Sequence, residues 1–183
     1  MAMWEATLWI ACFAAIALMI YPSLYERSLA SAVAAHLCLA APFFALVSRF
    51  LVNDTSIQYV VAFGGESLPF KYRFAATWAA REGPILMWVV WLTILTWIWR
   101  KPITGKYRES IASRDFRQRI VYGFCLTLLL IAIVLNPFKE TPNFFFGAGL
   151  NELLQTDLMI IHPPLIFLAY SFCIFISAIA LAG

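Results

Sequence analysis

The sequence contains only two histidines, His36 and His162, and both have the chemistry of a metal ligand. His162 is followed directly by Pro163 and Pro164. Proline is favoured in the first turn of a helix, where its missing N–H has no partner, and it holds the preceding residue extended. The spacing therefore predicts an imidazole just outside a helix N-terminus. There it could serve as a metal or haem ligand, or as a hydrogen-bonded surface residue.

His36 lies within a long apolar stretch, which allows two interpretations. An ionisable group inside a membrane helix is a candidate functional residue. A neutral imidazole can also bond to a neighbouring helix and have only a structural role. A similar choice applies to four tryptophans, which could line a flat cofactor or pack and anchor helices: Trp88, Trp91, Trp97 and Trp99.

Arg81 and Glu82 come just before Pro84 at the expected start of a helix. The helix dipole favours a carboxylate at that position, so Glu82 needs no further function to explain it. The sequence has no glycine-rich phosphate loop, no spacing typical of a metal cluster and no Ser/His/Asp order. We therefore predict no catalytic residue.

The elements that must position these residues are membrane helices. Hydrophobic residues make up 63% of the 183 positions and charged residues 13%, whereas a soluble domain has about 45–50% and about 25%. A spanning helix needs about 20 largely apolar residues. The composition predicts an all-α membrane protein, a single membrane domain over 1–183 with about five spans: 4–21, 29–52, 84–99, 120–135 and 163–182.

Charge distribution predicts the orientation of these spans. The segment from Arg100 to Arg119 carries seven basic residues, and short basic loops face the cytoplasm or the mitochondrial matrix. We expect it to be a solvated linker. The N-terminus and two aromatic-rich loops, 53–83 and 136–162, then lie on the outer face and pack on each other. Six aromatic residues of the first loop are expected at the membrane surface: Tyr59, Phe63, Phe70, Tyr72, Phe74 and Trp78.

Three stretches, in matching order and spacing, resemble the N-terminal part of CcmF, the haem lyase component of cytochrome c maturation. The first is VNDTSIQYV, from Val52 to Val60. The second is YRFAATW, from Tyr72 to Trp78, with EG at 82–83 and LMW at 86–88. The third begins with NPF at 136–138 and continues through GLN at 149–151, LLQ at 153–155 and IHPP at 161–164 to Tyr170. The resemblance covers essentially the whole chain.

The resemblance implies a membrane protein that holds haem at the outer face and helps join its vinyl groups to apocytochrome c. It also implies that His162 is an axial ligand of that haem. The sequence departs from the family at Arg81, where relatives have His, at Ala79 and Pro84, and in the segment 155–159. The tryptophan-rich WWD segment and the family's other haem-ligating histidines lie beyond the region that resembles this chain.

Two functions are therefore expected. In the first, the chain is a subunit of a split haem lyase and is not catalytic alone. Haem is shared with a companion chain that carries the WWD segment, while a haem chaperone and apocytochrome c are further partners. In the second, it is a CcmF-derived structural subunit of a larger inner-membrane respiratory complex without haem. A transporter component is disfavoured, because no repeated or broken-helix pair is present. We expect a mitochondrial or bacterial inner membrane and no nucleic-acid partner.

Overall fold

The computed structural model describes residues 4–23, 28–105, 108–142 and 149–183, and within these ranges the chain is helical and has no strand. The all-α prediction is confirmed. Two short helices, α4 (Gln58–Phe63) and α5 (Phe70–Ala76), and a 3₁₀ turn, η1 (Glu152–Leu154), connect the longer helices. The longer helices are α1 (Glu5–Ile20), α3 (Leu29–Leu51), α6 (Glu82–Ile98), α7 (Ile111–Leu135) and α8 (Asp157–Ala182).

Three of these helices are long and apolar enough to cross a membrane. They are α3, α7 and α8, with 23, 25 and 26 residues. Helices α1 and α6 are also apolar but shorter, with 16 and 17 residues. At a rise of about 1.5 Å per residue, α1 is about 24 Å long, slightly less than the hydrocarbon core of about 30 Å.

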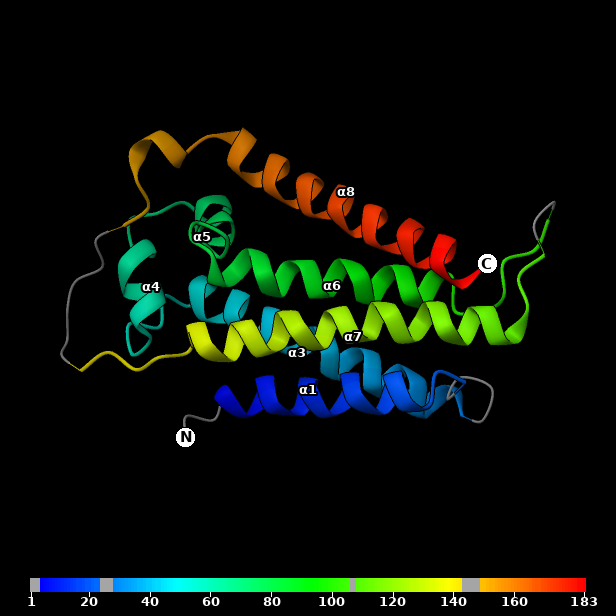
Figure 1. The fold of residues 1–183 in the computed structure, drawn as a ribbon. Coiled ribbons are helices and arrows are strands. Elements are labelled where there is room, and N and C mark those ends of the chain that lie inside the picture. Colours follow the sequence, from blue (N-terminus) through cyan, green and yellow to red (C-terminus); the bar gives the residue numbers. More distant parts are fainter. Residues whose placement is uncertain (1–3, 24–27, 106–107, 143–148) are drawn as a thin grey trace.

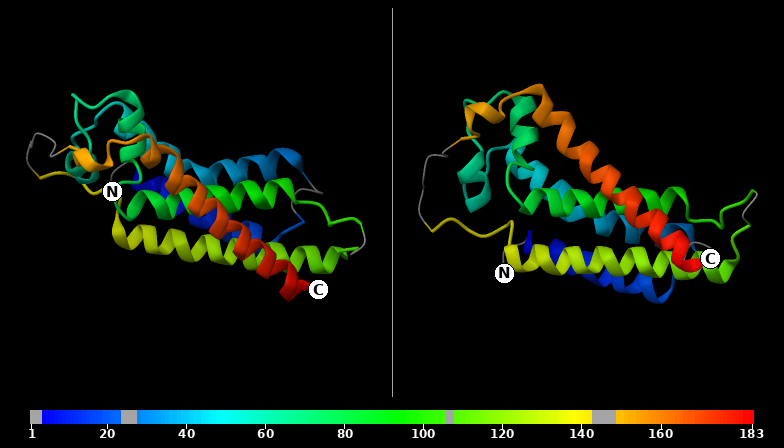
Figure 2. Two further views of the ribbon diagram at one scale, coloured as in Figure 1. Left: turned by 90° about the horizontal axis from the view of Figure 1, so that it is seen from above. Right: turned by 45° about the horizontal axis from the view of Figure 1, so that its top comes forward.

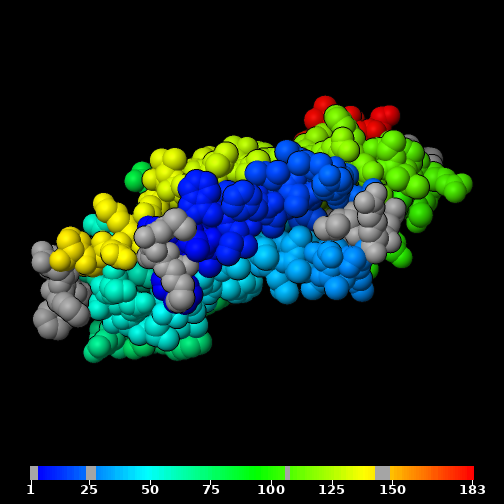
Figure 3. All heavy atoms as spheres, turned by 90° about the horizontal axis from the view of Figure 1, so that it is seen from below, coloured from blue at the N-terminus to red at the C-terminus, as the bar shows by residue number. Residues whose placement is uncertain are grey.

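The long helices lie side by side in one bundle (Figures 1 and 2). Helix α1 lies on the bundle surface between α3 and α7 (Figure 3). Helix α8 crosses α6 and α7 on another face at an oblique angle (Figure 2). Helices α4 and α5 and turn η1 gather at the end where α6 and α8 begin (Figure 1). We call this the α4–α5 end, and the opposite end, where α6 connects to α7, the Arg100 end.

Small and apolar side chains on one face of α1 make its close packing possible. Leu8, Ala11, Ala15 and Leu18 are each at most 2% exposed and lie on one face of the helix. Alanine lets neighbouring backbones approach closely, which is the main source of attraction between helices in lipid. Helix α1 is thereby held in the groove between α3 and α7.

His36 joins α3 to α7 inside the bundle. Its Nδ1 lies 2.7 Å from the Ala32 carbonyl oxygen, and its Nε2 lies 3.0 Å from the Tyr122 hydroxyl. The ring also packs edge-on against Trp97, with centroids 5.2 Å apart. The interpretation that His36 bonds to a neighbouring helix is confirmed.

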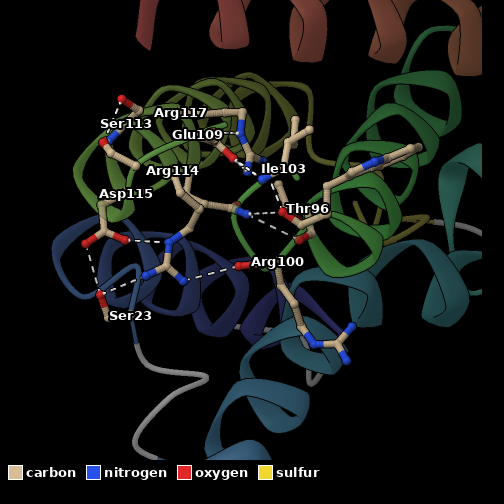
Figure 4. Close-up of polar contacts among 12 residues, drawn as sticks. Ser23, Thr96, Arg100, Ile103, Glu109, Ser113, Arg114, Asp115 and Arg117 are labelled. Atoms are coloured by element: carbon tan, nitrogen blue, oxygen red, sulfur yellow. Dashed lines mark hydrogen bonds and ion pairs between the residues drawn. The ribbon is translucent and has the colours of Figure 1, made fainter. Parts of the chain in front are cut away.

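A buried ion pair lies at the Arg100 end (Figure 4). Arg117 donates from Nε and Nη2 to the two carboxylate oxygens of Glu109, at 2.7 and 2.9 Å. The side chains of Arg117 and Glu109 are only 0% and 8% exposed. The prediction of a solvated linker from Arg100 to Arg119 is therefore wrong, because α7 begins at Ile111 and turns part of this segment into the bundle.

The buried polar groups of α7 cap the C-terminus of α6. The last carbonyls of a helix have no partner within it. Arg117 donates to the Trp99 carbonyl at 3.1 Å, Arg114 to that of Arg100 at 3.2 Å, and Gln118 to that of Thr96 at 3.3 Å. Cations at this position also complement the helix dipole. The hydrogen bonds that these side chains donate to the carbonyls explain why charged groups are buried here.

Glu109→Gln is expected to lower the free energy of unfolding by about 3 kcal/mol, because it leaves the buried Arg117 without its counter-ion. Burial alone would raise the pKa of Glu109, but hydrogen bonds from Arg117 and from the Ile103 N–H lower it below its ordinary 4.5. The stabilisation is therefore complete above pH 4.5 and is lost as the pH falls through the lower folded pKa. Thermal unfolding in detergent between pH 7 and pH 3 measures both effects.

Glu140→Gln is the matched control, because Glu140 is exposed and lies at the other end of the bundle. It should leave stability unchanged at every pH. Equal stability of the Glu109→Gln variant and the wild type at pH 7 would contradict the importance of the buried pair.

Candidate functional site

His162 lies in the second turn of α8, and its side chain is exposed. The expectation that it precedes the helix is wrong. Thr156 is extended and Asp157 begins the helix. The positive end of the helix dipole stabilises the Asp157 carboxylate at this position. Pro163 and Pro164 therefore lie inside α8 rather than at its start.

Trp78 replaces a hydrogen bond that Pro163 cannot make. Proline has no N–H, so the carbonyl four residues earlier, on Met159, loses its helical partner. The indole Nε1–H of Trp78 donates to this carbonyl oxygen at 2.7 Å. The early start of α8, with Pro163 inside the helix, is therefore stabilised by the side chain of Trp78, which comes from a distant part of the sequence.

Two further contacts fix the relation between α5 and the first turn of α8. Trp78 is 4% exposed and packs edge-on against Phe74, with ring centroids 4.8 Å apart. Lys71 Nζ lies 2.7 Å from Asp157 Oδ1, and this bond raises the pKa of Lys71. The ion pair is exposed and adds little stability, but the buried indole holds the start of α8 on α5.

The segment between α5 and α6 is folded tightly around Tyr59. The Tyr59 hydroxyl donates to the Thr77 carbonyl at 2.9 Å and accepts from the Ala80 N–H at 3.2 Å. Burial raises the pKa of Tyr59, so the phenol stays neutral. A Cβ at Gly83 would overlap the Thr77 carbonyl, so this turn requires glycine.

Tyr59 and Trp78 were both expected at the membrane surface, and for these two residues that prediction is wrong. They are 7% and 4% exposed because each has a polar atom that bonds the backbone. Phe70, by contrast, is 72% exposed. Aromatic content alone did not distinguish a surface ring from one that satisfies a buried carbonyl.

The two predicted outer loops do pack on each other. The Gln58 N–H donates to the Lys139 carbonyl and the Thr141 N–H to the Ser56 carbonyl, both at 2.8 Å. These bonds flank an isolated antiparallel bridge between Ile57 and Glu140. The loops therefore form one connected layer at the α4–α5 end.

Glu82 and the tryptophans of α6 have structural explanations. Glu82 is the first residue of α6, as expected for a carboxylate favoured by the helix dipole. Trp88 packs against Phe124 of α7 and Phe167 of α8, with centroids 5.3 and 5.7 Å apart. Trp99 packs against Phe175 of α8 at 5.4 Å. The packing interpretation is confirmed for these two tryptophans.

The two histidines are not brought together as a ligand pair. His36 bonds Tyr122 inside the bundle, whereas His162 is exposed on α8. In the described ranges, no three His, Cys, Asp or Glu side chains are grouped so that they could hold a metal ion. What this chain offers is a single accessible imidazole on a helix whose start is fixed.

Comparisons with known proteins identify bacterial relatives. The cytochrome c-type biogenesis protein CcmF of Escherichia coli K12 is 39% identical over 136 residues, which is 72% of this chain. CcmF of Haemophilus influenzae is 36% identical over 137 residues. The probable cytochrome c-type biogenesis protein NrfE of Escherichia coli K12 is 28% identical over 170 residues. The chain spans 20% of the length of either CcmF and 29% of NrfE. No protein-family model and no solved structure matches the chain.

Trp78→Phe should loosen the first turns of α8, because it keeps an aromatic ring but leaves the Met159 carbonyl without its donor. An unsatisfied buried carbonyl costs about 1–3 kcal/mol. Hydrogen exchange of the amides in 157–162 should accelerate, while exchange in α1 and α3 stays slow. Trp9→Phe is the control, because Trp9 is 44% exposed on α1. Unchanged exchange in 157–162 would contradict the assigned role of Trp78.

Proposed function

From the premise that this chain is homologous to part of the CcmF and NrfE cytochrome c-type biogenesis proteins, we propose that it is one subunit of a split haem lyase. In this proposal His162 is an axial ligand of a haem held at the outer face for attachment to apocytochrome c. A companion chain with the WWD segment supplies the rest of the site, and a haem chaperone delivers the haem. The observation that carries the proposal is the exposed imidazole of His162 on a helix start fixed by Trp78.

Exposed apolar side chains lie beside His162 on the same face of α8. Residues four apart and three apart lie on one face of a helix, which groups His162 with Leu158 and Leu165. These two side chains are 75% and 55% exposed. If haem is bound here, His162 would hold its iron and the two leucines would contact the apolar part of the macrocycle. When bound, haem supplies the vinyl groups to which cysteine thiols of apocytochrome c are joined.

The chain is a multi-pass membrane protein, and we propose that all five long helices are spans. Helix α1 lies alongside α3 and α7, and α6 lies alongside α3, α7 and α8 (Figure 1). Trp4 lies just before α1 and Trp99 just after α6. Aromatic residues at such helix ends are favoured at the membrane–water interface. The basic Arg100 end then faces the cytoplasm. The bacterial origin of the relatives favours a bacterial inner membrane over a mitochondrial one.

Single cysteines at positions 56, 101 and 140 test the five-span arrangement. The native residues Ser56, Lys101 and Glu140 are all exposed. In a background without the four native cysteines, a membrane-impermeant maleimide should label positions 56 and 140 in intact cells. Position 101 should react only after permeabilisation. Labelling of positions 56 and 101 from the same side would show that α6 does not span.

His162→Ala should lower cytochrome c maturation by about tenfold or more, since even residues that merely support a metal ligand carry costs of this size. The level of the chain in the membrane should stay normal, because Pro163, Pro164 and the Trp78 bond remain. Added imidazole should restore part of the activity by filling the vacated position. Maturation is measured by the haem-staining of c-type cytochromes.

Glu152→Ala is the control, since Glu152 is exposed in η1 close before α8. Cytochrome c maturation in the Glu152→Ala variant should equal that of the wild type. If His162→Ala also leaves maturation and the haem spectrum unchanged, the ligand assignment is wrong. A structural subunit of a larger inner-membrane complex without haem then becomes the better function.

A further inference from the structure

Helix α8 is longer than a membrane span requires. Its 26 residues extend about 39 Å at a rise of about 1.5 Å per residue, whereas the hydrocarbon core is about 30 Å thick. The range 163–182 is about 30 Å long by the same measure, and it contains no Asp, Glu, Lys, Arg or His. In the five-span arrangement proposed above, this range is the span. The six residues before it, 157–162, which we call the His162 segment, then lie at the outer surface of the bilayer.

Two prolines join the His162 segment to the span. Pro163 and Pro164 lie inside α8 and have no N–H, so the carbonyls of Met159 and Ile160 lose their usual helical donors. Sharp bends in helices occur mainly at such positions. The backbone of α8 therefore resists bending less at this junction than in the span.

The two parts of α8 are packed unequally. The buried residues of α8 all lie in the span, and they are Ser171, Phe175 and Ala178. In the His162 segment no side chain is buried. Helix α8 also diverges from α6 toward its own start (Figures 1 and 2). Because local opening is easiest where buried contacts are few, the His162 segment can move while the span stays in place.

Few contacts hold the His162 segment beside α5. The Trp78 indole donates to the Met159 carbonyl at 2.7 Å. Lys71 and Asp157 pair at 2.7 Å, but their side chains are 52% and 77% exposed, and exposed ion pairs contribute little. Met159 and Ile160 are half-buried and add apolar contacts. The Trp78 bond is therefore the contact whose loss should release the segment.

We propose that Pro163 and Pro164 form a hinge at the outer surface of the bilayer. About this hinge the His162 segment moves between a docked position, held by Trp78, and a released position in which that hydrogen bond is broken. The docked position predominates, because in it the Met159 carbonyl has a donor. In the proposed haem lyase, release lets the imidazole reach incoming haem and docking fixes its place. That role rests on the proposed function, whereas the hinge itself does not.

Spin labels can detect this motion. A label at position 158 in the His162 segment is paired with one at position 134 on α7, and a control label at position 176 in the span is paired with the same reference. The native side chains Leu158, Val134 and Ile176 are all exposed. The full chain, without its four native cysteines, is reconstituted in lipid nanodiscs, and distances are measured by pulsed electron paramagnetic resonance. In the otherwise native chain, each pair should give one narrow distribution.

Trp78→Phe should add a second distance to the 158/134 distribution, because it releases the segment, and should leave the 176/134 distribution unchanged. Adding Pro163→Ala and Pro164→Ala should restore a single distance, because the new N–H groups bond to the Met159 and Ile160 carbonyls. An unchanged 158/134 distribution in the Trp78→Phe variant would overturn the hinge. A second distance that persists without the prolines, or one that also appears for 176/134, would overturn it too, since either shows motion centred elsewhere.

The two proline replacements in the otherwise native chain give a measurement that does not depend on Trp78→Phe. Hydrogen exchange of the amides in 157–162 should slow several-fold, because helical hydrogen bonds are restored at the junction. Exchange in α1 should stay as in the wild type. Equal or faster exchange in 157–162 would overturn the hinge.

The same variant tests the role of the hinge in the proposed function. Cytochrome c maturation should fall, although His162 and the amount of chain in the membrane are unchanged, because the segment no longer moves. If His162→Ala lowers maturation and the proline replacements do not, the hinge has no part in the function. If neither variant changes maturation, the haem-lyase function fails, and the spin-label distances still decide whether the hinge exists.

Discussion

The structure depends on one constraint: a backbone carbonyl that loses its helical partner near a bilayer must find another donor, because the hydrocarbon offers no water. Both ends of the bundle meet this constraint with long side chains. At the Arg100 end, Arg114, Arg117 and Gln118 of α7 donate to carbonyls in the last turn of α6 and just beyond it. At the α4–α5 end, Trp78 donates to the Met159 carbonyl that Pro163 leaves free.

These contacts also determine where the proposed ligand lies. Pro163 leaves the Met159 carbonyl without its helical donor, which is unfavourable in an apolar environment unless another donor replaces it. The indole of Trp78 stabilises the Asp157 start of α8 and thereby places His162 on the helix, one turn from its beginning. Trp78 and Met159, which lies three residues before His162, are 81 positions apart in the sequence, yet they meet at one hydrogen bond. The position of the imidazole therefore depends on a residue from a distant part of the sequence.

Much of the fold could be predicted from the sequence, because long apolar blocks become helices in a membrane whatever their neighbours are. The starts of α7 and α8 could not, since charged residues were taken to lie outside helices and the two prolines were taken to begin one. Arg114, Arg117 and Gln118 recur at helical spacing with Val121, on one buried face of α7, and Ser110 caps that helix. This periodicity was a signal in the sequence. The pairing of His36 with Tyr122 had no such signal, because the relative register of two helices is set by packing across the whole bundle.

The placement of α8 shows why polar contacts matter more than apolar area in such a protein. Only Ser171, Phe175 and Ala178 of α8 are buried, although the helix has 26 residues. In water so much exposed apolar surface would direct assembly, but in lipid it is solvated as well as it would be against another helix. Apolar area therefore cannot select one orientation of α8.

The orientation has to come from directional contacts, and the bond from Trp78 to Met159 and the aromatic contacts of Trp88 and Trp99 supply them. Because these contacts occupy one side of α8, a face with Leu158 and Leu165 stays exposed beside His162, and this is the face on which the proposal places haem.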